Sequence, residues 1–282
     1  MRYTFIFVIV FFNFLLAAQP KADFSADVTT GCGVVQSKFQ SLSTGKNLTY
    51  SWNFGTGSTS TISNPIKIFF TPGQYKVCLT VKDSSGLSDT KCKDDYISVY
   101  SRYVPNFAVQ DSFICEGSST GFKDLTISPN GPIVNWIWDL GGSAGVVQQN
   151  TKGTVTSRFD LPGNYAATLS TIDVAGCKET FTKQVLTVIS RPVVGADFGS
   201  GVICDTAGKI TITNKSPKIN GISFEWDFGN GQKFSGYNPP VINYSGEGKY
   251  NVILTAVNQA NNCSSSATFY NAVTVENLSK FQ

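Results

Sequence analysis

One short string of residues occurs three times in this sequence and fixes the size of the folding unit. It reads WNFGTG from Trp52, WDLGGS from Trp138 and WDFGNG from Trp226, so the tryptophans are 86 and 88 residues apart. A second string follows each copy: TPGQYKVCLTV, LPGNYAATLST and GEGKYNVILTAV. Two markers that recur in the same order at nearly the same period indicate a repeat of about 85 residues. A unit of that length can fold around its own core.

The second string predicts a β-strand with one buried face. Tyr75, Val77, Leu79 and Val81 alternate with polar residues, which is the period of two of an antiparallel sheet facing solvent on one side. Glycine, serine, threonine and asparagine are abundant, as strands joined by tight turns require. We therefore expect an all-β chain. The expected core residues are Trp52, Tyr75, Trp138, Tyr165, Trp226 and Tyr250, with each tyrosine placed as in a tyrosine corner.

The two strings, together with the Asn64-Pro65 and Asn238-Pro239 pairs, resemble the PKD (polycystic kidney disease) domain, whose usual strings are WDFGDG and PGxYxVxLxV. The resemblance implies three tandem immunoglobulin-like β-sandwich domains, at residues 23–100, 104–190 and 194–277. Thr56, Gly142 and Asn230 replace the second Asp of the family string, which argues against a cation bound there. The short linkers contain Pro105 and Pro192, so we expect an extended array of beads in a rod.

The first residues have the order of a secretory signal peptide. Arg2 precedes an apolar run from Phe5 to Leu16, and small residues follow at Ala17 and Ala18. We expect a signal peptide over residues 1–18, with cleavage near Ala18 or at Ala22. The mature chain would then be secreted or held at the cell surface, and no later stretch is apolar and long enough for a membrane span.

Several classes of function are excluded or disfavoured by composition. The chain has no histidine, so it cannot build Ser-His-Asp or Cys-His machinery, and it lacks the commonest zinc ligand. Its net charge is +3 without a cluster of cations, which disfavours a nucleic-acid partner. The candidate carboxylates Asp94, Asp95, Asp139 and Asp227 are expected at strand ends and in turns, where they face solvent or cap turn amides. We expect no enzyme, no cofactor and no metal site.

Three aromatic residues have two possible roles. Trp136 lies two residues before Trp138 and so points to the same face of the strand. With Tyr237 and Tyr244 it could form a sugar-binding platform, but a second core aromatic is the favoured interpretation.

The seven cysteines predict disulfides, because an exported chain meets an oxidising environment. Repeats two and three hold two cysteines each, which gives the pairs Cys115–Cys177 and Cys204–Cys263. In the first repeat, a hairpin loop of Ser84, Ser85 and Gly86 would place Cys78 opposite Cys92 and leave Cys32 as the odd thiol. The rival pairing joins Cys32 to Cys92 and leaves Cys78 free.

The leading functional hypothesis is an extracellular, non-catalytic adhesion or recognition protein that binds a protein or a carbohydrate through its repeats. It depends on an analogy of fold, because no binding chemistry is visible in the residues. The alternative is the spacer of a longer secreted enzyme or gliding-type surface protein that continues beyond Gln282. A third possibility is a purely mechanical stalk without a ligand.

Overall fold

The computed structural model describes residues 19–142, 145–204 and 208–276, and in these ranges every regular element is a β-strand. The fold class is therefore all-β, as the sequence predicts. The signal peptide expected over residues 1–18 lies outside the described residues. The described residues divide into two compact units, one formed by those up to Val104 with Ile127–Val134 and Ile172–Glu179, and the other by the remaining described residues. We call residues 23–100, 104–190 and 194–277 repeats 1, 2 and 3.

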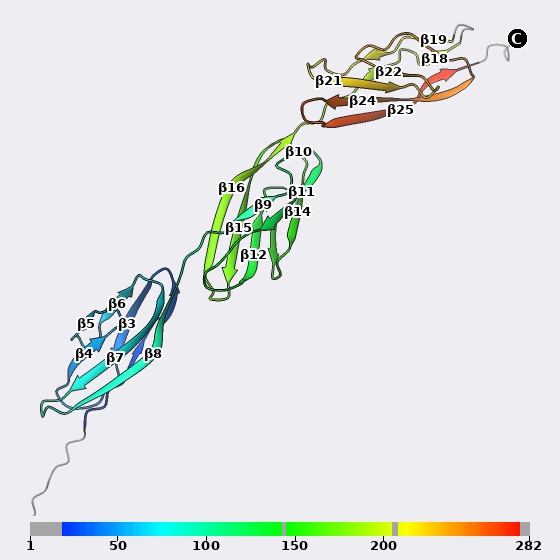
Figure 1. The fold of residues 1–282 in the computed structure, drawn as a ribbon. Coiled ribbons are helices and arrows are strands. Elements are labelled where there is room, and N and C mark those ends of the chain that lie inside the picture. The colour runs from blue at the N-terminus through cyan, green and yellow to red at the C-terminus, as the bar shows by residue number, and fades with distance from the viewer. Residues whose placement is uncertain (1–18, 143–144, 205–207, 277–282) are drawn as a thin grey trace, which may run out of the picture. The chain divides into compact units, whose positions relative to one another are not determined.

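Repeat 1 is a sandwich of two sheets (Figure 1). One sheet has the strand order β1-β3-β6 and the other the order β2-β8-β7-β4-β5. The strands are β1 Phe24–Ala26, β2 Thr30–Cys32, β3 Val35–Ser41, β4 Thr49–Asn53, β5 Thr59–Ser60, β6 Ile66–Phe69, β7 Gly73–Lys82 and β8 Ser88–Tyr100. The pairing of β2 with β8 is parallel, and the other pairings of this repeat are antiparallel.

Repeat 2 has the same two sheets, with orders β14-β11-β9 and β10-β16-β15-β12-β13. Its short edge strand β10 again pairs in parallel with the last strand, β16. The strands are β9 Phe107–Val109, β10 Phe113–Cys115, β11 Ser118–Asp124, β12 Ile133–Asp139, β13 Val146–Gln149, β14 Thr154–Phe159, β15 Gly163–Asp173 and β16 Lys178–Ile189.

Repeat 3 keeps the larger sheet, with the order β18-β25-β24-β21-β22, but its second layer is divided into the pairs β17-β20 and β19-β23. The strands are β17 Ala196–Asp197, β18 Val202–Ile203, β19 Lys209–Ile210, β20 Thr213–Asn214, β21 Ile222–Asp227, β22 Lys233–Ser235, β23 Ile242–Asn243, β24 Gly248–Asn258 and β25 Ser264–Val275.

The alternation predicted for the strand after each tyrosine is present in the structure. In β7, Val77, Leu79 and Val81 are fully buried, while the intervening side chains lie on the outer face. Trp52 is buried between the sheets, with its ring stacked at 6.0 Å on that of Phe54. The Trp-x-Phe spacing of the recurrent string thus places two aromatic rings on one face of the strand.

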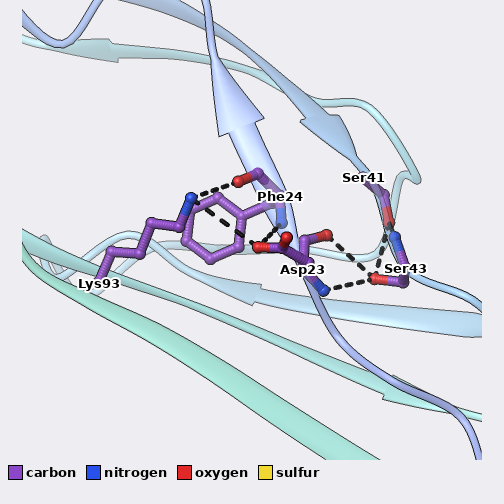
Figure 2. A network of polar contacts seen from close by, with 5 residues as sticks. All are labelled: Asp23, Phe24, Ser41, Ser43 and Lys93. Carbon is purple, nitrogen blue, oxygen red and sulfur yellow. Dashed lines mark hydrogen bonds and ion pairs between the residues drawn. The ribbon is translucent and has the colours of Figure 1, made fainter.

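Lys93, in β8 of the larger sheet, connects that sheet to the first strand, β1, of the smaller sheet (Figure 2). The Lys93 ammonium donates a 2.5 Å hydrogen bond to the carbonyl of Phe24 and lies 4.7 Å from the centre of the Phe24 ring. Asp23 lies 3.9 Å from the same ammonium, and its backbone is bonded to the hydroxyl of Ser43. The side chain therefore holds β1 by a charged hydrogen bond and a cation–π contact together.

Candidate functional site at the repeat junctions

The recurrent string forms the same turn in each repeat. The amide of Gly55 donates 2.9 Å to Asn53 Oδ1, and the amide of Gly229 donates 3.0 Å to Asp227 Oδ1. The corresponding bond of Gly141 to Asp139 is 3.2 Å long. These bonds place Asp139 and Asp227 in the turn-capping role that the sequence predicts. The Gly229 amide and the neighbouring Lys233 ammonium lower the pKa of Asp227.

The three tyrosine corners are also present. The hydroxyls of Tyr75, Tyr165 and Tyr250 donate to the backbone oxygen four residues earlier, at 2.6, 2.8 and 2.8 Å. Their rings are half-buried at the edge of the core, whereas the three tryptophans of the recurrent string are at most 2% exposed. The tryptophans are therefore the central core residues, and the tyrosines fasten the turn before the long strand.

The aromatic residues considered for a sugar platform are packing residues. Trp136 is 5% exposed and Tyr244 is 2% exposed. The Tyr244 hydroxyl donates to the carbonyl of Phe228, and burial raises the pKa of Tyr244 to about 12. Tyr237 is half-buried and donates 2.6 Å to the carbonyl of Ser216. The three rings therefore do not form a shared exposed surface on which a sugar could stack, and their role is packing in the core.

The paired carboxylates of repeat 1 do not form a reactive pair. Asp94 is exposed and forms a 2.9 Å ion pair with Lys76, which is also exposed. Asp95 is exposed with a φ of 48°, at the irregularity in the β7–β8 pairing. Both residues lie in a bulge inside β8, which spans Ser88–Tyr100, and not at a strand end as expected.

The structure joins Cys78 to Cys92, the pair that the predicted hairpin register gave. Asp83 and Leu87 close the hairpin by a 3.0 Å backbone bond, which confirms the three-residue loop. The rival pair of Cys32 with Cys92 is therefore wrong.

The two pairs predicted within repeats 2 and 3 are wrong. Cys115 does not pair with Cys177, and Cys204 does not pair with Cys263. The structure instead contains Cys32–Cys177 and Cys115–Cys263, with Cα–Cα distances of 5.7 and 5.5 Å. Cys204 is the free cysteine, and it is exposed; Cys32 is not the odd thiol.

The geometry of the last strand of each repeat explains why cysteines of the same repeat do not pair in repeats 2 and 3. Cys115 ends β10 opposite Ile189, which is the last residue of β16, whereas Cys177 directly precedes the first residue of β16. The 12 residues of β16, at about 3.3 Å each, separate the two thiols by roughly 40 Å. Cys204 and Cys263 are placed in the same way at opposite ends of β25, whose length is also 12 residues. A cysteine at the far end of one repeat thus reaches the hairpin of the next repeat in the chain.

At the first junction, polar contacts surround the Cys32–Cys177 bridge. Ser101, in the linker, receives a hydrogen bond from the Asn130 amide at its carbonyl and donates its own amide to Asn130, at 2.8 and 3.0 Å. Tyr103 is 8% exposed, and its hydroxyl donates 3.0 Å to the carbonyl of Cys177. The linker is therefore bonded to both the loop and the hairpin of repeat 2 at this junction.

At the second junction, an arginine joins the residues that follow the two bridged cysteines. Arg191 Nε donates 2.8 Å to the carbonyl of Glu116, and Nη1 donates 2.7 Å to the carbonyl of Ser264. Glu116 follows Cys115, and Ser264 follows Cys263. At this junction a planar guanidinium reinforces the covalent bridge by binding backbone on both of its sides.

Two classes of site are missing from the described ranges. Residues 19–142, 145–204 and 208–276 contain no group of three or more histidine, cysteine, aspartate or glutamate side chains placed to hold a metal ion. The same ranges contain no helix of the length and apolar character needed to cross a bilayer.

The paired sheets, the parallel edge strands and the tyrosine corners define a tandem series of immunoglobulin-like β-sandwich modules. Sequence models described as PKD domain match residues 17–99 and 103–188, and a further PKD domain model matches residues 209–271. The chain belongs to the PKD domain family. PKD domains are non-catalytic modules, although the relatives below are proteases.

Three similarities place the chain among known proteins. It is 30% identical over 168 residues to pre-pro-metalloprotease PrtV of Vibrio cholerae serotype O1, over 59% of this chain and 17% of the protease. It is 55% identical over 42 residues to collagenase ColA of Bacillus cereus, over 15% of this chain and 4% of the collagenase. The crystal structure of the PKD1 domain from V. cholerae PrtV is 32% identical, with a TM-score of 0.26, and covers 28% of this chain and 98% of that domain. The chain thus spans a small part of the proteases it matches.

Proposed function

We propose that this chain is an extracellular spacer whose repeats are fastened to one another by disulfides, and that it carries no catalytic activity of its own. Within it, residues 23–100, 104–190 and 194–277 are the folding units, and residues 1–18 are a signal peptide that directs export. The observation that supports the spacer function is that two of the three disulfides, Cys32–Cys177 and Cys115–Cys263, connect consecutive repeats.

The junction contacts support this function over that of a flexible tether. When a short linker is the single connection between two modules, the modules can adopt many relative orientations. A disulfide across the same junction removes most of these orientations. The Asn130–Ser101 and Arg191–Glu116 hydrogen bonds would restrict the same two junctions further. Disulfides of this kind persist in oxidising compartments, which supports a secreted or surface location.

The experiment is a comparison of inter-repeat distance distributions in the whole chain. Fluorophores on unnatural amino acids in exposed loops of repeats 1 and 3 would report energy transfer for the oxidised chain and for the variant C32S/C177S/C115S/C263S. We expect a narrow distribution in the oxidised chain and a broader one in the variant. Equal widths would show that the disulfides do not fix the junctions, and would remove the spacer function in this form.

A second candidate function, recognition of a protein partner, is favoured by one feature of repeat 1. The edge strand β6 and the residue after it expose Ile66, Ile68 and Phe70, which are 59%, 36% and 69% exposed. The corresponding outward positions of repeat 2 are Thr156, Arg158 and Asp160, all polar and exposed. An exposed apolar edge strand is the surface to which an extended segment of another chain can add.

The same comparison supplies a matched variant for this second function. Replacing Ile66, Ile68 and Phe70 by Thr, Arg and Asp gives repeat 1 the outer residues that repeat 2 already carries on β14 and at Asp160. We expect the variant to remain folded and to lose adhesion of the chain to producing cells or host matrix. Unchanged adhesion in a folded variant would count against recognition through β6.

A further inference from the structure

Cys204 occupies a position that carries a bridged cysteine in both other repeats. Cys32 is the last residue of β2 and lies opposite Tyr100 at the end of β8, and Cys115 lies in the same way opposite Ile189. In repeat 3, Ile203 lies opposite Val275 as Gly31 lies opposite Val99 in repeat 1, and Val275 corresponds to Val99 because each pairs with the glycine that opens the preceding strand. Cys204 follows Ile203 as Cys32 follows Gly31. The three cysteines are therefore equivalent in register.

The partner of each bridged cysteine is equivalent as well. Cys177 and Cys263 each follow a residue with positive φ, Gly176 or Asn262, in the turn before the last strand of a repeat. Both are buried, at 0% and 1% exposure. Repeat 1 carries Leu87 at this place, where Asp83 donates to its carbonyl as Asp173 does to that of Cys177. The hairpin cysteine is thus present only in the two repeats that follow another repeat in the sequence.

The two bridges obey one rule, in which the far-end cysteine of a repeat joins the hairpin cysteine of the next repeat. They close sequence separations of 145 and 148 residues. By the same rule the far-end cysteine of repeat 3 lacks its partner, because the other six cysteines of the sequence are paired with one another. Cys204 is correspondingly free and exposed.

We propose that Cys204 is a covalent docking site for the hairpin cysteine of a further PKD-type repeat. That repeat lies either further along a longer polypeptide or on a second polypeptide, and in both cases the ligand is a thiol presented in the turn before its last strand. The inference deepens the proposed spacer function and rests on it: the array of repeats would continue beyond repeat 3 through another disulfide between consecutive repeats. The expected partner is a cysteine in the turn before the last strand of a repeat, because Cys32 and Cys115 are each bonded to a cysteine at that place.

The bond forms by a balanced oxidation. The two thiols lose two protons and two electrons as their sulfurs join, and a disulfide oxidant, such as an exported thiol oxidoreductase or glutathione disulfide, takes up the electrons and becomes two thiols. Exchange proceeds through a mixed disulfide on one of the two cysteines, which requires that cysteine to be accessible, and Cys204 is exposed.

The test extends the whole chain by one repeat. A second copy of residues 190–276, with its own Cys204 changed to Ser, is joined after Glu276, the counterpart of Ile189, and the protein is oxidised with glutathione disulfide. We expect alkylation of Cys204 to be lost, and peptide mapping without reduction to link it to the Cys263 of the added copy. The matched control changes that added Cys263 to Ser and should leave Cys204 open to alkylation.

Two outcomes would overturn the proposal. One is an extended chain in which both cysteines stay open to alkylation while Cys32–Cys177 and Cys115–Cys263 form; the other is a Cys204–Cys204 dimer as the main product. A C204S version of the extended chain shows by circular dichroism whether the added repeat folds without the bond. Mapping of protein from its producing cells separates the sources, because a partner on another polypeptide leaves on reduction. The readout is chemical, so it can succeed even if the distance distributions reject a stiff spacer.

Discussion

Repeats 1 and 3 share an interior but are fastened differently outside it. Trp52 and Trp226 are both buried and both stack at 6.0 Å on the phenylalanine two residues later. On the outer face of the sheet, repeat 1 has Cys78 bonded to Cys92, whereas repeat 3 pairs Ile253 with Thr268 at the equivalent register.

The clamp on the first strand differs too. In repeat 1, Lys93 holds Phe24 by a hydrogen bond to its carbonyl (Figure 2). Repeat 3 carries Phe269 at the register of Lys93, and the Phe269 ring meets that of Phe198 at 5.2 Å. Repeat 2 follows repeat 1, with Lys183 donating 2.6 Å to the carbonyl of Phe107. The difference teaches that the recurrent strings specify the core and the turns, while the contacts on the outer faces differ from one repeat to another.

Loss of the central tryptophan should have the largest effect and should be equal in both repeats. We expect Trp52→Ala and Trp226→Ala each to destabilise their own repeat by about 3–5 kcal/mol, because each removes a buried indole and leaves a cavity. Hydrogen exchange of the whole chain, read by mass spectrometry on peptides from each repeat, separates the two responses. A much smaller loss in repeat 3 would show that its divided second layer collapses around the cavity.

The outer disulfide should stabilise repeat 1 alone. We expect the double variant C78I/C92T, which installs the residue pair of repeat 3, to lower the stability of repeat 1 by about 3 kcal/mol, as for a loop of this size. The indole N–H signals of Trp52 and Trp226 in heteronuclear NMR spectra, followed through a urea titration, report the two repeats separately. If both signals respond equally, the bond stabilises more than its own repeat.

The sequence predicts most of this fold because its signals are local. The turn at Asp227, the Tyr250 corner and the Cys78–Cys92 pair each depend on residues close in sequence or on one hairpin register. The junction bridges could not be derived in this way. Pairing within repeats leaves Cys32 unpaired and pairing between repeats leaves Cys204 unpaired, so counting cysteines favours neither scheme.

The signal that distinguishes the two schemes is the length of one strand. Cys177 and Cys115 lie at opposite ends of β16, and a sequence reading that places β10 beside the end of β16 would have rejected their pairing. That placement is a parallel contact between residues about 75 apart in sequence, for which the alternation of side chains gives no indication.

The contact of Lys93 with Phe24 in repeat 1 can be compared directly with the Phe269–Phe198 contact of repeat 3. We expect Lys93→Ala to cost repeat 1 about 1–2 kcal/mol, because it removes a charged hydrogen bond and the contact with the Phe24 ring. Lys93→Phe, which installs the residue of repeat 3, should recover about half of that loss by ring packing. The Trp52 indole signal in urea gives both values. A phenylalanine variant no better than alanine would mean that the two clamps are not interchangeable.

The smallest expected effect concerns acid sensitivity, because repeat 1 makes the same turn with Asn53 that repeat 3 makes with Asp227. The Gly229 amide and Lys233 lower the pKa of Asp227 in the folded protein, so folding favours its ionised form. The stabilisation is complete above the unfolded pKa of about 3.9 and is lost as the pH falls through the lower folded value.

Asp227→Asn keeps the acceptor for Gly229 and removes the titration, so the stability of repeat 3 should vary less below pH about 4 than in the natural chain. Urea titrations between pH about 2 and 6, read at the Trp226 indole with Trp52 as the internal reference, measure the difference. A variant whose repeat 3 loses stability in acid as steeply as before would place the acid-sensitive groups elsewhere, with Asp197, whose pKa is also lowered, as the next to replace.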